Sequence, residues 1–449
     1  MPRAARADAN APPILGVTAE SGPRRSESGV GALMAWADRL WAVTYLNNPG
    51  NGAGAGLWEI DEHLAIRRRH TANSTYANRL LHVPSNQVSI GAYLIDMAGN
   101  VRVIDELANL RLTASMTHLK DPDNLLYVLT MEGLFYEVDV RSLKTRPLFD
   151  LVKELGIQGQ PHFKGACTGQ GRVVVANNTF ASPGDTGGRL AEFDGSRWNI
   201  LERKAFMEVS AYEGFGNVLF ATGSDDASAI LKVCSAGRWT TCRLPKSSHA
   251  FDHFWQTEWT RIREVETQRF LMDCHGMFYE LSPVVYDSSV WGVRPICSHL
   301  RVIPDFCTFR GMLALGGNQG GYAGGNLLSP QPQSGIWFGK TDDLWSFGKP
   351  QGWGGPWRDT PVKAGTASDP FLMTGFDKKV LHVTQDGDAS AEIVVEADFL
   401  GNGRWKRYTM LNVAAGGYEC HVFPEGFSAH WVRLIPSKDC LATAQFFYT

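Results

Sequence analysis

The sequence has little charge, and its charges are balanced. Only 20% of the 449 residues are Asp, Glu, Lys or Arg, and 43 Lys and Arg stand against 46 Asp and Glu, for a formal net charge of −3. A surface that follows a phosphate backbone needs an excess of basic side chains. The composition therefore predicts that nucleic acid is not a partner.

Long apolar runs are also missing. No stretch reaches the roughly 18 apolar residues that a membrane-spanning helix requires, so no membrane span is expected. Residues 1–25 are rich in Ala, Pro, Arg and Ser and lack the apolar centre of a secretory signal. We therefore expect residues 1–29 to form a disordered tail, or to be what remains after a signal was replaced, and no signal peptide is visible in this chain.

Several catalytic and metal-binding signatures are absent. The eight cysteines contain no C-x-x-C pair, which argues against a zinc or iron–sulfur site. Cys234 and Cys242 have the spacing of a hairpin and could bridge two strands in an oxidising compartment, or they could be buried thiols. A phosphate-binding loop, a dinucleotide-binding glycine fingerprint and a Gly-x-Ser-x-Gly elbow are also missing.

A repeated strand motif is what the sequence does contain. It reads aromatic-x-hydrophobic-Asp or a close variant, and its seven copies lie at residues 57–61, 92–96, 135–139, 190–194, 230–234, 278–282 and 336–340. The copies recur at intervals of about one four-stranded propeller blade, so they predict seven blades. Helical periodicity is almost absent, and residues 150–155 are the best candidate for a helix.

The pattern changes from about Ala367 onward. Short runs of alternating polar and apolar residues, at 379–383, 391–397 and 430–434, predict antiparallel strands. The chain is therefore predicted to be all-β, with a seven-bladed β-propeller over residues 30–362 and a small C-terminal antiparallel β-sandwich-like domain over residues 363–449. The alternative is that the last segment closes the propeller with further strands. The Trp- and Gly-rich residues 352–357 are expected in a rim loop of the last blade.

Candidate functional residues lie beside the predicted inner strands, because loops of several blades meet at the mouth of a propeller. Seven histidines have such positions: His82, His118, His162, His249, His253, His275 and His299. Arg261 and Arg263 would point to one face of an extended strand. They form either part of a salt-bridged outer strand or a pair of guanidiniums aimed at a carboxylate.

Long segments of the chain resemble a known enzyme family. These segments are residues 76–93, 162–165, 257–266, 272–279, 333–345 and 427–431. They are similar to seven-bladed propeller enzymes that act on the L-rhamnose-α-1,4-D-glucuronate caps of arabinogalactan side chains. The resemblance covers the chain from about Val30 onward, and it implies an acidic plant-type polysaccharide or oligosaccharide as substrate.

The family contains both lyases and α-L-rhamnosidases. Its glycosidase members rely on a His in an early-blade loop just before a Gly-rich turn. Here residues 45–49 precede the Gly-rich residues 50–56 and contain no His, which favours the lyase. A rhamnosidase on the same linkage, and a non-catalytic propeller that binds glycans or another protein, are the alternatives.

Lyase chemistry suggests roles for particular side chains. The enzyme must neutralise the uronate carboxylate, remove the C5 proton and protonate the departing oxygen, and Arg, His and Tyr suit these tasks. The resemblance points to His82 as the principal acid/base residue. Arg310 and Arg263 are predicted to neutralise the carboxylate, with His162 and Tyr279 lining the site and available for proton donation.

The resemblance carries two further expectations. It implies a calcium ion in the central channel, for which no ligands can be assigned from this sequence. It implies a secreted or periplasmic location. The protein is expected to be a monomer.

Overall fold

The structure, a computed structural model of the whole chain, describes residues 14–16, 28–46, 56–71, 78–179, 187–212, 214, 217–247, 259–283, 285, 289–299, 301–318 and 334–449. In these residues the chain is almost entirely β. The helix expected at 150–155 is confirmed as α1 (Leu151–Glu154). Short 3-10 helices are η1 (Val83–Ser85), η2 (Asp105–Leu107) and η4 (Thr341–Ser346). None of the described helices has the length and apolarity to cross a bilayer.

The chain divides into two compact units. Unit 1 comprises Met1–Ser210, Glu258–Thr267 and Arg301–Asp343, and unit 2 comprises Ala211–Thr257, Gln268–Leu300 and Leu344–Thr449. The domain bounds expected from the sequence, at 29/30 and 362/363, stay a prediction.

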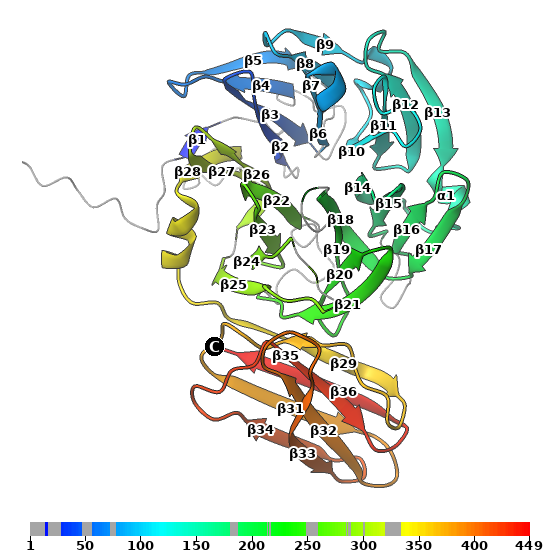
Figure 1. The fold of residues 1–449 in the computed structure, drawn as a ribbon, viewed down its shortest axis with the longest axis vertical. Helices are drawn as coiled ribbons and strands as arrows, with labels where there is room; N and C mark the ends of the chain where they lie inside the picture. Colours follow the sequence, from blue (N-terminus) through cyan, green and yellow to red (C-terminus); the bar gives the residue numbers. More distant parts are fainter. Residues whose placement is uncertain are drawn as a thin grey trace, which may run out of the picture. The chain divides into compact units, whose positions relative to one another are not determined.

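Unit 1 is built from four-stranded antiparallel sheets that follow one another along the chain (Figure 1). The first two sheets contain β2 (Ser28–Trp36), β3 (Arg39–Leu46), β4 (Gly56–Ile60) and β5 (Ile66–Thr71), then β6 (Arg79–His82), β7 (Gln87–Ile90), β8 (Tyr93–Asp96) and β9 (Val101–Val103). The next two contain β10 (Leu112–Thr117), β11 (Leu125–Thr130), β12 (Leu134–Asp139) and β13 (Thr145–Asp150), then β14 (Phe163–Gly169), β15 (Arg172–Asn177), β16 (Arg189–Phe193) and β17 (Trp198–Glu202).

A further sheet of unit 1 joins distant parts of the sequence. Its strand order is β1-β28-β27-β26, with β1 (Ile14–Gly16), β26 (Val302–Phe309), β27 (Met312–Asn318) and β28 (Ser334–Gly339). The strand β22 (Arg261–Glu266) also lies in unit 1, and β18 (Ala205–Tyr212) begins there.

The first strands of these sheets gather at the middle of unit 1. The strands β26, β2, β6, β10 and β14 lie next to one another in that order, and β22 lies next to β26. The fourth strands, among them β9 and β13, lie on the outside (Figure 1). This is the arrangement of a β-propeller, in which each sheet buries its faces against its neighbours. One such contact packs Val43 and Leu57 of one sheet with Ile90 and Ile95 of the next.

The repeated motif lies on the third strand of each sheet. In the four copies that have Asp, at positions 61, 96, 139 and 194, this residue ends the strand or directly follows it and accepts hydrogen bonds from the turn. Asp96 Oδ1 accepts from the backbone N–H groups of Ala98 and Asn100, at 2.9 Å each. Asp194 Oδ1 accepts from Ser196 Oγ and from two backbone N–H groups, and these bonds hold the pKa of this carboxyl at about 2. The repeat therefore encodes a hairpin turn, because Asp side chains readily bond the backbone two residues on.

Unit 2 contains the remaining strands. One sheet has the internal order β19-β20-β21-β30-β35-β32-β33, another contains β23, β24 and β25, and a third has the order β29-β36-β31-β34. Their bounds are β19 (Val218–Ser224), β20 (Ala229–Ser235), β21 (Arg238–Leu244), β23 (Arg269–Cys274), β24 (Met277–Leu281), β25 (Arg294–Ser298), β29 (Gly352–Val362), β30 (Phe371–Leu372), β31 (Lys379–Gln385), β32 (Ala391–Asp398), β33 (Lys406–Val413), β34 (Tyr418–Val422), β35 (Trp431–Pro436) and β36 (Cys440–Tyr448).

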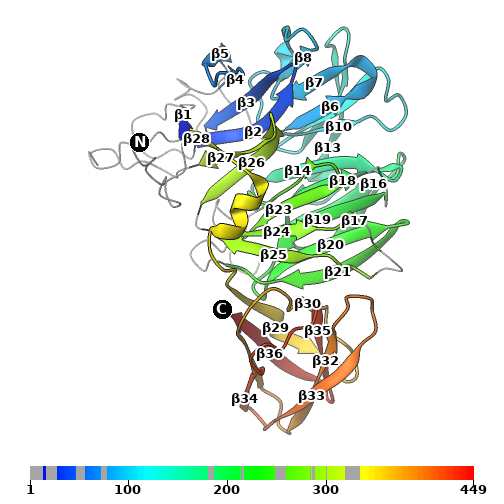
Figure 2. The ribbon, with the colours of Figure 1, turned by 60° about the vertical axis from the view of Figure 1, so that its left-hand side comes forward.

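Two of these sheets pack face to face. Phe371 of β30 stacks on Phe446 of β36, with ring centroids 5.1 Å apart. Inward-facing residues such as Ile393 and Leu381 are fully buried between the layers. Figure 2 shows the two layers of this part of unit 2.

The structure corrects the expectation for residues 352–357. They do not form a rim loop, because they belong to β29, which pairs with β36. A Cβ on Gly355 would lie 1.9 Å from the carbonyl oxygen of Ala444, and the register shifts between Gly354 and Trp357. The glycines here permit close approach of two strands at a bulge rather than a flexible turn.

The hairpin of β20 and β21 contains both Cys234 and Cys242. Its register places Cys234 opposite Trp239 and Cys242 opposite Leu231. The two thiols do not face each other, and no disulfide joins them. Both lie in the core, which agrees with the buried-thiol interpretation.

Candidate functional site

Two buried carboxylates lie on first strands of unit 1. Asp305, in the middle of β26, is fully buried, and Glu208 on β18 is 5% exposed. Each stands in an otherwise apolar strand, so each needs a charged or hydrogen-bonding partner.

Arginines from β22 and β6 supply those partners. Arg263 donates from Nε to Asp305 Oδ1 at 2.8 Å and from Nη1 to Glu208 Oε1 at 2.6 Å. Arg261 Nη1 donates to the other oxygen of Glu208 at 3.2 Å, and Arg79 Nε lies 3.3 Å from Asp305 Oδ2. The prediction that Arg261 and Arg263 share one face of their strand is confirmed, because both reach Glu208.

A buried lysine and a tryptophan extend this group. Lys164, on β14, places Nζ 4.7 Å from the ring centroid of Trp259, and Arg261 places Cζ 5.3 Å from the same centroid. Such cation–π contacts gain strength when they are removed from water. Gly165 permits the approach of β18, since a Cβ there would lie 3.3 Å from Glu208 Oε2. We call Arg79, Lys164, Glu208, Trp259, Arg261, Arg263 and Asp305 the central basic cluster.

The central basic cluster brings together four cations and two carboxylates. Glu208 pairs with Arg261 and Arg263, and Asp305 pairs with Arg263 and Arg79. Burial would lower the pKa of Arg263, but Asp305 and Glu208 outweigh that effect and raise it. Burial lowers the pKa of Arg79, and Asp305 opposes this. A guanidinium group with a free donor is suited to a carboxylate ligand, because its planar fork matches the two carboxylate oxygens.

One donor of the cluster remains available. Nε and Nη1 of Arg263 bond Asp305, Glu208 and the carbonyl of Ile262. Within the described part of the chain Nη2 has no hydrogen-bond partner, and the side chain is 14% exposed. Arg263 can therefore donate to a ligand while its other nitrogens hold it in place.

The structure does not bring His82 to Arg263. His82 ends β6, about 10 Å along the strand from Arg79, and it caps η1 by accepting from the backbone N–H of Ser85 at Nδ1. Its Nε2 lies 2.8 Å from the carbonyl oxygen of Pro122. Both ring nitrogens of His82 therefore contact backbone groups, Nδ1 that of Ser85 and Nε2 that of Pro122. Sequence spacing alone does not reveal these contacts.

Arg310 is also away from the cluster. It occupies the turn after β26, with φ of 50°, about 17 Å along an extended strand from Asp305. Its Nη1 lies 3.8 Å from Glu62 Oε2, and both side chains are 48% exposed. An ion pair so exposed contributes little to binding or stability.

His162 precedes β14, two residues before Lys164. Its Nδ1 lies 2.7 Å from Asn178 Oδ1. An amide oxygen only accepts, so this contact is a hydrogen bond when Nδ1 carries the ring proton.

His82 and His162 lie at opposite ends of β6 and β14, the two strands that flank β10. Asn78 bonds Ser115 and His82 bonds Pro122, so β6 and β10 run in the same direction. Thr168 donates to the carbonyl of Thr117, late in both strands, which is consistent with the same direction for β14 and β10. His82 is the last residue of β6, whereas His162 stands before the first residue of β14.

Tyr279 lies in unit 2 and is fully buried on β24. Its hydroxyl donates to the carbonyl of Pro245 at 2.9 Å, and burial raises its pKa well above the usual value. The expectation that Tyr279 lines a substrate site is not met, because its hydroxyl is occupied inside the core. His249 and His253 lie outside the described residues.

Sequence reasoning missed Arg79, Lys164, Glu208 and Asp305. Arg79 and Lys164 lie inside segments that carry the family resemblance. The signal for the other two is a lone acid within an apolar strand, as in Phe206-Met207-Glu208-Val209. Such a residue indicates a buried partner elsewhere in the chain.

The described residues contain no group of three or more His, Cys, Asp or Glu side chains that could hold a metal ion. Calcium takes six to eight oxygen ligands, commonly with carboxylates among them. The calcium ion implied by the resemblance thus has no side-chain ligand set here, and it stays a prediction.

Comparisons with known proteins gave matches among solved structures alone. No protein-family model and no curated protein matches the chain. The β-propeller domain of Cps50 (Swd1) from Myceliophteria thermophila is 13% identical, with a TM-score of 0.41, over 71% of this chain and 98% of that one. YCF48 from Cyanidioschyzon merolae is 12% identical, with a TM-score of 0.35, over 67% of this chain and 84% of that one.

Proposed function

We propose that the protein is a polysaccharide lyase that cleaves the L-rhamnose-α-1,4-D-glucuronate linkage of arabinogalactan side chains. We further propose that the motif copies form seven propeller blades, followed by a small β-sandwich domain. The observation that carries the proposed activity is Arg263 in the central basic cluster, whose Nε and Nη1 are held by Asp305 and Glu208 while Nη2 has no hydrogen-bond partner among the described residues.

Binding of the substrate begins with its carboxylate. Arg263 donates from Nη2 to the glucuronate carboxylate, while Glu208 and Asp305 hold the guanidinium in one orientation. The proton on C5 becomes more acidic when the neighbouring carboxylate is neutralised, because the negative charge that develops on the acid group is stabilised.

The elimination itself needs one base and one acid. A base removes the C5 proton. The electron pair of the broken C5–H bond forms the C4–C5 double bond as the bond from C4 to the bridging oxygen breaks. That oxygen takes a proton and leaves on free rhamnose, so the other product is an unsaturated uronate. We assign the base to His162, which lies two residues before Lys164 of the central basic cluster and whose Nδ1 contacts Asn178 Oδ1.

A product assay tests the activity. The protein is incubated with arabinogalactan that carries rhamnose-capped glucuronate, and ultraviolet absorbance of the conjugated enoate is followed together with free rhamnose. Appearance of both is the expected result. Release of rhamnose without absorbance would indicate an α-L-rhamnosidase, and binding without either product would indicate a non-catalytic propeller; both would contradict the lyase. The same assay after treatment with EDTA tests the requirement for calcium.

A further inference from the structure

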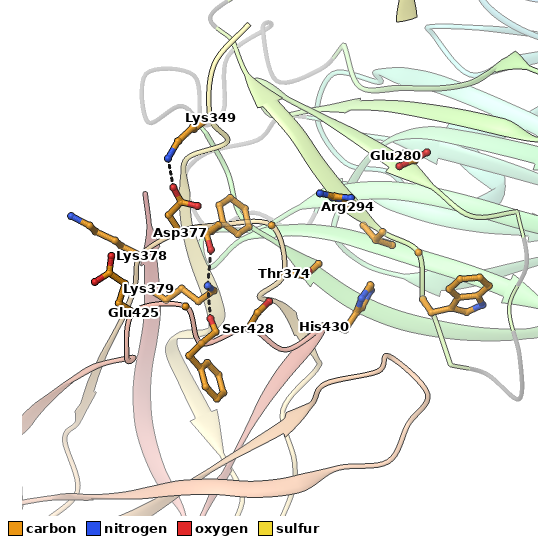
Figure 3. Close-up of a pocket in the computed structure, with 17 residues that line it drawn as sticks. Glu280, Arg294, Lys349, Thr374, Asp377, Lys378, Lys379, Glu425, Ser428 and His430 are labelled. Carbon is orange, nitrogen blue, oxygen red and sulfur yellow. Dashed lines mark hydrogen bonds and ion pairs between the residues drawn. The ribbon is translucent and has the colours of Figure 1, made fainter. Parts of the chain in front are cut away.

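Unit 2 contains a pocket of about 1020 Å³. It is bounded by the ends of β24 and β25, by residues 374–379 and by residues 425–430. The volume is sufficient for a small organic ligand or a sugar. Figure 3 shows Arg294 on one side of the pocket, with Thr374, Ser428 and His430 across from it.

The pocket walls are fixed by close backbone contacts. Gly375 has φ of +86°, and a Cβ there would lie 2.6 Å from Pro295 Cγ, so this turn fits against β25 only as glycine. Met373 donates its backbone N–H to the carbonyl of His430 at 3.0 Å. Trp431 Nε1 donates to the carbonyl of Val290 at 2.6 Å. The pocket is therefore formed before any ligand arrives.

Lys379 brings a buried charge to this pocket. The residue is 3% exposed, and its Nζ donates to the carbonyl oxygens of Phe376, at 2.6 Å, and Phe427, at 2.8 Å (Figure 3). Nζ has three protons, and in the described chain the third has no partner. The nearby carboxylate of Asp377 forms its ion pair with Lys349; burial lowers the pKa of Lys379, and the charge of Asp377 opposes only part of that effect. Two neutral carbonyls solvate the ammonium but do not balance its charge, and a buried unpaired charge is unfavourable.

Arg294 supplies a second cation. One face of its guanidinium lies against Trp345, with Cζ 5.0 Å from the ring centroid. No ion pair joins Arg294 to a described carboxylate, although Glu280 lies opposite it in the register of β24 and β25. The guanidinium edge is thus available to a carboxylate ligand.

The remaining lining is suited to a polyhydroxylated ligand. Thr374 and Ser428 offer hydroxyl groups, and Glu280 and Glu425 offer carboxylate oxygens. Trp291, which is 39% exposed, offers an aromatic ring. Donors, acceptors and one flat apolar surface together match a sugar ring better than a simple anion.

We propose that this pocket binds a carboxylate-bearing sugar, with Lys379 and Arg294 contacting the carboxylate and Ser428 and Thr374 contacting the hydroxyls. The site lies wholly in unit 2 and does not depend on the lyase activity proposed for unit 1. It would hold an acidic saccharide without any bond being broken.

Hydrogen exchange measured by mass spectrometry locates such binding. The full chain is labelled with and without sodium D-glucuronate, and we expect slower exchange in peptides that cover residues 372–381 and 423–431. D-glucose and sodium acetate are the controls. Protection by glucuronate that exceeds protection by either control supports the site. Equal protection by glucose or by acetate, or no protection of these peptides, would overturn it.

Substitutions identify the cation that binds. Arg294→Met and Lys379→Met should weaken the glucuronate-dependent protection, measured as the concentration for half effect, by about tenfold or more. Lys406→Met, at the exposed start of β33 and outside the pocket, is the matched control and should leave this concentration unchanged. Arg294 is exposed on β25, so its variant is expected to fold even if loss of the buried Lys379 disturbs unit 2. An unchanged half-effect concentration in a folded Arg294→Met variant would reject the assignment.

Discussion

Arg263 and Asp305 form a buried ion pair between β22 and β26, with Nε 2.8 Å from Oδ1. The two residues come from first strands that lie side by side in unit 1. Asp305 Oδ2 also accepts the backbone N–H of Leu33 on β2 at 2.8 Å and lies 3.3 Å from Arg79 Nε on β6, so one carboxylate links four strands. A change at either residue should therefore affect the fold as well as any ligand bound by Arg263.

Arg263→Met should lower lyase turnover by at least about a hundredfold, because neutralisation of the substrate carboxylate is lost in the transition state. Turnover is to be measured per folded molecule, with folding checked by thermal unfolding. Arg146→Met is the matched control, since Arg146 is 67% exposed and pairs with Glu137 on the outer part of its sheet. Parental turnover in a folded Arg263→Met protein would contradict the proposed role.

Glu208→Gln should lower the free energy of unfolding by about 3 kcal/mol, because it removes the buried carboxylate that Arg261 and Arg263 share. Denaturation by urea measures this change. Glu62→Gln removes an exposed carboxylate whose partner is Arg310, and it should change stability little. Similar stability of the two variants would show that the cluster does not need the charge of Glu208.

His82→Ala should lower stability by about 1–2 kcal/mol, because the cap of η1 and the contact with the Pro122 carbonyl are both lost. Thermal unfolding measures the loss, and Ser85→Ala should reproduce part of it. Turnover of the same His82→Ala sample tests the acid/base role expected from the family resemblance. Near-parental turnover in the folded variant would remove that role and leave the capping role.

Gly375→Ala should destabilise unit 2 by about 2–3 kcal/mol, since a Cβ meets Pro295 at 2.6 Å and φ is +86°. Gly365→Ala is the control: its φ is +70°, and nothing lies within 4 Å of the added Cβ. Backbone strain alone should make this control cost about 1 kcal/mol. Equal losses, measured by chemical denaturation, would mean that the contact with Pro295 relaxes without cost.

Alkaline pH should weaken the fold through buried thiols. Burial raises the pKa of Cys297 and of Cys307 from 9.0 to about 12. The stability they contribute is complete below pH 9 and is lost as pH rises toward 12, because the unfolded thiol releases its proton first. Each group should add a slope of about 1.4 kcal/mol per pH unit in this window. Urea denaturation from pH 8 to 11 measures how steeply the free energy of unfolding falls with pH. This fall should be less steep in Cys297→Ala than in the parent protein. An equally steep fall in the variant would show that Cys297 does not contribute to the loss of stability at alkaline pH.

Local patterns could be read directly from the sequence. The repeated aromatic-x-hydrophobic-Asp motif marked third strands, because an Asp that bonds the next turn acts over a few residues, as Asp96 and Asp194 do. The shared face of Arg261 and Arg263 followed in the same way from the two-residue period of a strand. Residues 352–357 were misread because glycine is common in loops and is equally required where strands approach closely, as at Gly355.

The sequence by itself determined that this chain is all-β, where several of its turns fall and which strand residues share a face, since all of these depend on neighbours only a few positions apart. The tertiary structure alone decided that Glu208 and Asp305 meet Arg263, and that Lys379 is buried against the carbonyls of Phe376 and Phe427. These contacts join strands and loops far apart in the chain. The attraction between buried charges depends on their separation in space and on the absence of water around them, and neither quantity can be read from spacing along the sequence.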